Sequence, residues 1–157
     1  MDSIEYQHGD VVLKGYLKYD GLLKSKRPGI LLIHESQGIT EFIIDRATQL
    51  ANLGYIVFAL DMYGKGQVNN EKEASALAEA FNENQQLMRD RAAAGLEVLQ
   101  NNRKVDPSRL AAMGYSFGGT VALELARSGA ALACVVCFHC DLKTNNPPAR
   151  HQNHHYP

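Results

Sequence analysis

The residues most able to do chemistry surround Ser116. Residues 114–118 read Gly-Tyr-Ser-Phe-Gly, with an apolar run before them and a helical pattern after them. A serine at a sharp strand-to-helix turn exposes its oxygen above a sheet, and flanking glycines give the turn room. We therefore predict that Ser116 is a nucleophile and that the Phe117 N–H, at the helix N-terminus, stabilises an oxyanion. The alternative is a small-residue turn with a capping serine.

A second polar cluster, residues 34–38 (HESQG), ends another apolar run. In open α/β sheets, ligands bind beyond the carboxyl ends of the strands. Glu35 would there hydrogen-bond the nucleophile, hold a substrate group or cap the following turn. The sharp strand-to-helix turn that carries a nucleophile is called a nucleophile elbow. The Ser36 N–H is the candidate second oxyanion donor, because enzymes with such an elbow take that donor from this strand-to-helix loop. We expect His34 to hydrogen-bond backbone groups rather than to act as a base.

The cysteines and the C-terminal histidines give weaker signals. Cys137 and Cys140 form a C-x-x-C motif that closes a strand, whereas redox motifs open a helix that lowers the thiol pKa. These cysteines with His151, His154 or His155 would offer zinc ligands, but from a strand end and an unpatterned tail. We therefore expect neither a metal site nor a cofactor.

The elements that must position these residues are apolar runs alternating with helical patterns. Continuous apolar runs predict parallel strands buried on both faces, and a strand-helix-strand order predicts an α/β sheet. The N-terminal segments 3–6 and 11–19 predict a β-hairpin. The polar patch 82–86 divides a long helical stretch into two helices. The predicted buried strands cover 29–34, 55–60, 110–115 and 131–138; the helical segments cover 40–53, 71–102 and 117–127.

Length and composition exclude several classes of protein. The 157 residues fit one domain. The chain has 16 Lys and Arg against 17 Asp and Glu, so it has no basic footprint for nucleic acid. No apolar run is long enough to cross a membrane, and the N-terminus is too polar for a secretory signal. All three cysteines lie in one short window, which cannot staple a secreted fold. We expect a cytoplasmic protein.

Three stretches together resemble the dienelactone hydrolase family of α/β-hydrolases: LLIHESQG, VFALDMYGKG and VDPSRLAAMGYSFGGTVALELARSG. The resemblance runs from about residue 10 to about residue 144. It implies a three-layer sandwich with a mostly parallel sheet of about eight strands. It also implies hydrolysis of small-molecule lactones or carboxyl esters. The family usually has cysteine in the elbow, where this chain has Ser116. Its conserved glutamate matches Glu35, and its oxyanion N–H groups match Ser36 and Phe117.

The chain departs from the family pattern near residue 140. The family's triad Asp and His follow two further strands, and His139 and Asp141 match neither by register. We therefore expect an α/β-hydrolase domain over residues 1–140 that lacks the C-terminal strands, and a disordered tail over 141–157. A frameshift, an altered splice or a truncated gene model is our hypothesis for this change. The chain is then a serine hydrolase without its acid and base, or an inactive remnant that only binds or self-associates.

An open edge follows from the same expectation. The strand from Ala131 to Phe138 would be interior in a longer sheet. Without further strands it is a bare apolar edge, which aggregates or pairs with a second copy. The sequence thus predicts poor solubility or a homodimer joined through this strand.

Overall fold

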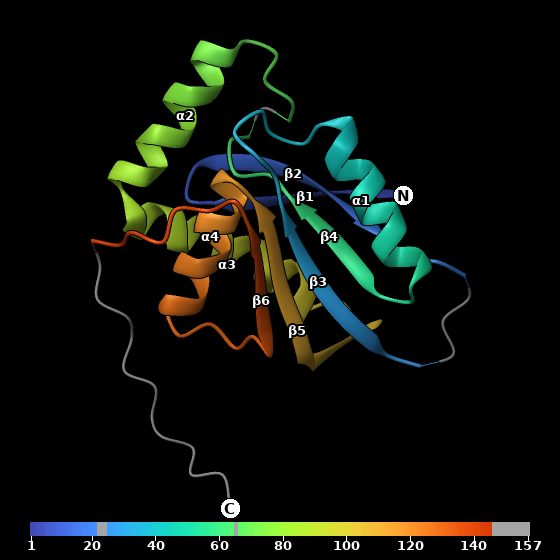
Figure 1. Ribbon diagram of the computed structural model, residues 1–157. Helices are drawn as coiled ribbons and strands as arrows, with labels where there is room; N and C mark the ends of the chain where they lie inside the picture. The colour runs from blue at the N-terminus through green and yellow to red at the C-terminus, as the bar shows by residue number, and fades with distance from the viewer. Residues whose placement is uncertain (22–24, 65, 146–157) are drawn as a thin grey trace, which may run out of the picture.

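The computed structural model describes residues 1–21, 25–64 and 66–145. In these ranges six strands form one sheet in the order β1-β2-β4-β3-β5-β6, with four helices packed around it (Figure 1). The strands are β1 (Asp2–His8), β2 (Val11–Lys18), β3 (Arg27–Ile33), β4 (Ile56–Leu60), β5 (Val105–Tyr115) and β6 (Cys134–Phe138). The helices are α1 (Glu41–Asn52), α2 (Glu71–Glu83), α3 (Gln85–Gln100) and α4 (Phe117–Arg127).

The pairing confirms the predicted hairpin and the predicted parallel strands. β1 and β2 pair antiparallel, and β2 pairs antiparallel with β4. β4, β3, β5 and β6 are parallel neighbours in that order. The carboxyl ends of these four strands therefore meet at one edge of the sheet, where the predicted site residues lie.

The apolar runs are continuous because both faces of the central strands are buried. In β3, Leu31 and Ile33 belong to the core beneath α3 and α4, while Ile30 and Leu32 belong to the core beneath α1. Helices thus cover both faces and give the predicted three layers (Figure 1). Alternate residues of one strand face opposite cores, so neither face of the run is polar.

The long helical stretch breaks where the polar patch predicted a break. Asn84 ends α2 and caps α3, and its side-chain oxygen accepts a hydrogen bond of 3.1 Å from the Leu87 N–H. Asn70 caps α2 in the same way, accepting from the Glu73 N–H at 3.0 Å. Asparagine satisfies the first free N–H groups of a helix, which fixes both starts.

Two predicted strand boundaries are wrong at their start. β5 begins at Val105 rather than at residue 110, because residues 106–109 bulge between the pairs Arg27–Val105 and Gly29–Leu110. β6 begins at Cys134 rather than at Ala131, because residues 130–133 complete the turn after α4. The Leu132 N–H donates to the Ala130 carbonyl there, and the sheet pairing starts with Ala111 opposite Cys134.

The residues just after β6 lie against α3 and α4. The Asp141 N–H donates to the Thr120 hydroxyl at 3.2 Å, and the Asn145 N–H donates to the Gln85 side-chain oxygen at 2.8 Å. Residues 146–157, including His151, His154 and His155, lie outside the described residues, so the disorder expected there stays a prediction. No helix in the described ranges is both long enough and apolar enough to cross a membrane.

Candidate active site

Ser116 lies at a strained turn between β5 and α4. Its backbone has φ 51° and ψ −117°, a conformation that residues with a Cβ rarely adopt. The residue is solvent-exposed, whereas Phe117, Gly118, Gly119 and Thr120 after it are buried. Strain of this kind, held by its surroundings, is typical of a nucleophile elbow. The predicted strand-turn-helix context of Ser116 is therefore confirmed.

The flanking glycines bring the helix close to the sheet. A Cβ added at Gly114 would overlap the Gly118 carbonyl. A Cβ added at Gly118 would overlap the carbonyl oxygen of Ile33, at the end of β3. The spacing of the motif thus reflects two close backbone approaches, and the second brings the end of β3 against the elbow.

The start of α4 is held from several sides. The Ser116 N–H donates to the Phe138 carbonyl at 2.7 Å, and the Ser116 carbonyl accepts from the N–H groups of Gly119 and Thr120. The Phe117 ring is buried and stacks on Tyr63 with centroids 5.7 Å apart. The Phe117 N–H belongs to the first helical turn, whose N–H groups lack intrahelical acceptors. It is a fixed donor, and its role as an oxyanion donor stays a prediction.

Glu35 and Ser36 form a tight turn beside the elbow. The Gly38 N–H donates to the Glu35 carbonyl at 3.1 Å, and Gly38 has a φ of 80°. This hydrogen bond closes the turn over Ser36 and Gln37, so the Ser36 N–H takes no part in it. Across the loop, the Val68 N–H donates to the Gln37 carbonyl at 2.8 Å. The turn is therefore anchored to the loop after β4, with Glu35 half-buried.

His34 bonds backbone groups, as predicted. The ring is fully buried; its Nδ1 lies 2.6 Å from the Glu35 carbonyl, and its Nε2 accepts from the Met62 N–H at 3.1 Å. These partners assign the proton to Nδ1 and leave the ring neutral. Burial lowers the pKa of His34 below its usual value. Both nitrogens are occupied, so His34 is not placed to serve as the base for Ser116.

Sequence reasoning missed a buried polar group beneath the site. The Asp61 carboxylate is fully buried and accepts from the N–H groups of Lys14, Tyr63 and Gly64. It thereby shapes the loop that anchors the turn containing Glu35. The sequence does contain a signal for this buried group. Asp61 ends an apolar strand, and the glycine-containing segment YGKG begins two residues later. Tyr63 packs on both His34 and Phe117, and its hydroxyl is a buried group with no hydrogen-bond partner among the described residues.

Asp141 and His139 lie just after β6 and could supply an acid or a base, but neither side chain is hydrogen-bonded to Ser116. Asp141 accepts from the Lys143 N–H at 2.9 Å, within its own turn, and His139 is an exposed residue with a φ of 53°. Within the described ranges, no histidine or carboxylate is hydrogen-bonded to the Ser116 hydroxyl. That neither residue occupies a triad position stays a prediction.

The two cysteines of the C-x-x-C motif, Cys137 and Cys140, are partly buried at the end of β6. All three cysteines are free, and burial, with the neighbouring Cys140 thiol, raises the pKa of Cys137 to about 11. A thiol with so high a pKa is a poor nucleophile at neutral pH. Among the residues that the structure describes, no group of three His, Cys, Asp or Glu side chains is arranged to hold a metal ion.

Comparison with known proteins assigns the family. A model described as the dienelactone hydrolase family matches residues 14–156. The chain belongs to the dienelactone hydrolase family. This family's α/β-hydrolase fold agrees with the parallel strands and the elbow, so the predicted fold class is confirmed.

Two solved structures and one curated protein are similar to the chain. The structure named m3DLH is 37% identical, with a TM-score of 0.89 over 93% of this chain and 61% of that chain. The dienelactone hydrolase-like promiscuous phosphotriesterase P91, from metagenomic libraries, is 34% identical, with a TM-score of 0.85 over 88% and 58%. The hydrolase fragment YghX of Escherichia coli K12 is 37% identical over 54 residues, which are 34% of this chain and 44% of YghX.

The chain is thus shorter than the solved structures it matches. It spans about three fifths of the length of both. The family match over residues 14–156 includes the elbow at Ser116 and the turn at Glu35.

Proposed function

We propose that this chain carries the nucleophile half of a serine hydrolase acting on carboxyl esters or lactones. The observation that supports this most strongly is the exposed Ser116 with a strained positive φ at the start of a buried helix. A serine that only capped α4 would not need this strain, and no side-chain cap bond is present at Ser116.

In the proposed reaction Ser116 Oγ attacks the carbonyl carbon of the substrate and loses its proton to a base. The carbonyl π electrons move to oxygen, and the N–H groups of Phe117 and Ser36 stabilise the resulting oxyanion. When the carbonyl re-forms, the bond to the leaving oxygen breaks and that oxygen takes up a proton. Water then hydrolyses the acyl-enzyme and restores the serine.

Glu35 would orient the nucleophile or the substrate. It follows β3, whose end lies against Gly118 of the elbow, and its backbone is fixed by the hydrogen bonds of Gly38 and His34. A carboxylate on such a fixed turn holds a hydroxyl more reproducibly than one on a free loop.

Whether Ser116 has a base to accept its proton distinguishes two candidate functions. A serine needs a proton acceptor, and removing one triad member typically lowers turnover by several orders of magnitude. Because no histidine is bonded to Ser116 in the described ranges, the second candidate is an inactive remnant that only binds or self-associates. A base from residues outside those ranges, or from a partner, would favour the first.

Phosphorus esters are the second substrate class to test. The relative P91 is named a promiscuous phosphotriesterase and is 34% identical over 88% of this chain. A site that stabilises a tetrahedral carbon oxyanion also suits a phosphoryl centre. We therefore propose assaying a p-nitrophenyl carboxyl ester and a p-nitrophenyl phosphotriester side by side.

A fluorophosphonate probe tests the nucleophile directly. We would measure the intact mass after reaction for the wild type, Ser116→Ala and Ser128→Ala, with circular dichroism to establish folding. Ser128 is an exposed serine at the other end of α4, so its variant controls for surface labelling. One adduct in the wild type and in Ser128→Ala, absent in Ser116→Ala, supports the hydrolase. A folded wild type without an adduct favours the remnant.

A further inference from the structure

Two of the three cysteines face the first turn of α4. Cys137 comes two residues after Val135, which packs against the core beneath α3 and α4, so both side chains lie on that face of β6. A Cβ added at Gly119, in the first turn of α4, would lie 3.5 Å from the Cys137 Cβ and 2.7 Å from the Cys140 Cβ. Because Gly119 has no side chain, the two cysteines share one small space beside the helix.

A bend at His139 brings Cys140 back beside Cys137. His139 has a φ of 53°, a left-handed conformation that turns the chain sharply after the strand. The Asp141 N–H then donates to the Thr120 hydroxyl at 3.2 Å, which holds the residue after Cys140 against α4. The backbone therefore positions one cysteine at the end of the strand and the other on the loop that folds back over it.

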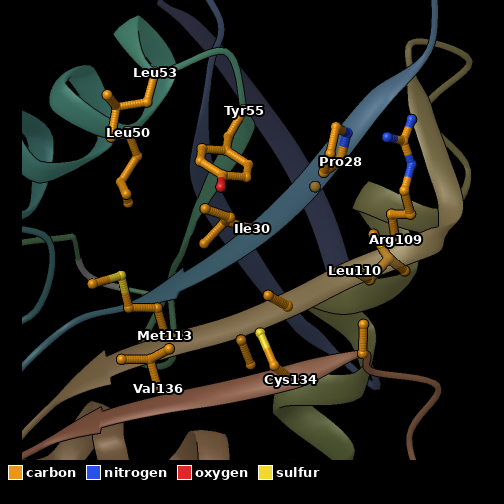
Figure 2. Close-up of a pocket in the computed structure, with 14 residues that line it drawn as sticks. Pro28, Ile30, Leu50, Leu53, Tyr55, Arg109, Leu110, Met113, Cys134 and Val136 are labelled. Atoms are coloured by element: carbon orange, nitrogen blue, oxygen red, sulfur yellow. The ribbon is translucent and has the colours of Figure 1, made fainter.

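The third cysteine lies on the opposite face of the sheet. Cys134 lines an apolar pocket of about 410 Å³ together with Val136, between the end of α1 and strands β3, β5 and β6 (Figure 2). Residues three apart in a strand point to opposite faces, so the sheet separates Cys134 from Cys137. Because strand side chains point to the two faces, neither position depends on what lies beside the outer edge of β6.

The thiols of Cys137 and Cys140 interact with each other. Both are free and partly buried. Burial raises the pKa of Cys137 to about 11, and the negative charge of a Cys140 thiolate and a hydrogen bond between the two side chains act in the same direction. Cys137 therefore keeps its proton while Cys140 is ionised. In such a pair the ionised thiol attacks an oxidant and the protonated thiol then displaces the product.

We propose that Cys137 and Cys140 form an intramolecular disulfide on reaction with a hydroperoxide, and that this disulfide fixes the end of β6 that holds Ser116. The Cys140 sulfur attacks the terminal peroxide oxygen, the O–O bond breaks, and an alkoxide or hydroxide leaves, which gives a sulfenic acid. The Cys137 sulfur then attacks the Cys140 sulfur. The S–O bond breaks, and the departing oxygen takes the Cys137 proton and leaves as water. The two thiols are oxidised, and the peroxide is reduced by the same electron pair.

Phe138 connects the cysteine pair to the elbow. Its carbonyl accepts the Ser116 N–H at 2.7 Å, and its ring stacks on Tyr115 with centroids 4.8 Å apart. A disulfide between Cys137 and Cys140 would enclose Phe138 in a covalent ring, so the end of β6 would lose much of its freedom to separate from the elbow. This modification site does not depend on the hydrolase activity proposed above.

Intact mass and thiol counting test the disulfide. The folded Cys134→Ser variant, which keeps only the pair, would be treated with excess hydrogen peroxide and alkylated in denaturant. It should lose two hydrogens and take up no alkyl group. With Cys137→Ser added, the disulfide cannot form, and Cys140 should instead give a sulfenic acid that dimedone labels. A Cys134→Ser protein that keeps both thiols, forms disulfides only between chains, or is oxidised to sulfinic acid without a disulfide would overturn the proposal.

Amide hydrogen exchange, measured by NMR on reduced and oxidised Cys134→Ser, tests the effect on the elbow. The Ser116 N–H, which is bonded to the Phe138 carbonyl, should exchange about tenfold more slowly in the oxidised form, and dithiothreitol should restore the faster rate. The Ala133 N–H is the control, because it is bonded to the Leu110 carbonyl at the start of β6, and its rate should change less. Equal changes at the two amides, or no change at Ser116, would overturn the proposed hold on the strand end.

Discussion

The Ser116 N–H and the Phe138 carbonyl are joined by a hydrogen bond of 2.7 Å. This bond connects the proposed nucleophile to the last residue of β6. The ring of Phe138 also stacks on Tyr115 at 4.8 Å, immediately before the elbow. The conformation of Ser116 thus depends on the docking of β6, a strand that lies beyond α4 in the chain.

Two substitutions of Ser116 distinguish the backbone strain at this residue from the reactivity of its hydroxyl. The unfolding free energy of Ser116→Gly should be about 1 kcal/mol higher than that of Ser116→Ala, because glycine adopts φ 51° without strain. Neither variant should react with a fluorophosphonate. Urea unfolding of both proteins measures the difference. An alanine variant as stable as the glycine variant would show that the turn stores no strain.

Gly118→Ala should open the elbow. Its Cβ would overlap the Ile33 carbonyl, so α4 must move from β3, and we expect a loss of about 2 kcal/mol or more together with the loss of probe labelling. Gly9→Ala is the control, because Gly9 has a positive φ but open space around it. That variant should lose only about 1 kcal/mol and keep its labelling. Equal losses in the two variants would contradict the close approach.

Glu35→Gln should slow the reaction of Ser116 with the probe about tenfold while leaving the unfolding free energy nearly unchanged, if the carboxylate orients the nucleophile. The rate of adduct formation by intact mass measures this effect. Glu41→Gln, an exposed glutamate in the first turn of α1, is the matched control and should react as the wild type does. Equal rates in both variants would leave Glu35 without a role in positioning the nucleophile.

The buried His34 should make stability depend on pH. Its folded pKa is lowered by burial, so below about pH 6.5 the unfolded chain binds a proton that the folded chain does not. The contribution is therefore complete above that pH and is lost as the pH falls, by up to about 1.4 kcal/mol per pH unit. Urea unfolding at pH 7 and pH 5 should show a smaller fall for His34→Gln than for the wild type. A steeper fall in the variant would reverse the assigned sign.

Tyr63→Phe should not destabilise the protein and should stabilise it by up to about 1 kcal/mol. The substitution removes a buried hydroxyl that has no partner among the described residues and keeps the ring that packs on Phe117. Thermal unfolding measures the change. A loss of more than about 1 kcal/mol would mean that the hydroxyl makes a stabilising hydrogen bond.

The local parts of this protein could be predicted from the order of its residues. The apolar runs predicted the parallel strands, the polar patch around Asn84 predicted the break between α2 and α3, and the glycines around Ser116 predicted the elbow. Each of these features depends on residues near one another in the chain, where spacing and side-chain size limit the backbone directly.

The contacts between distant groups became visible in the folded chain alone. The neutral state of His34 depends on the hydrogen bond from the Met62 N–H. The loop after β4 depends on the hydrogen bond between Asp61 and the Lys14 N–H. The backbone of Ser116 is fixed by its hydrogen bond to the Phe138 carbonyl. The early start of β5 and the late start of β6 likewise follow from pairing with neighbouring strands. Hydrogen bonds between separate strands depend on register, and register is set when both faces of the sheet pack.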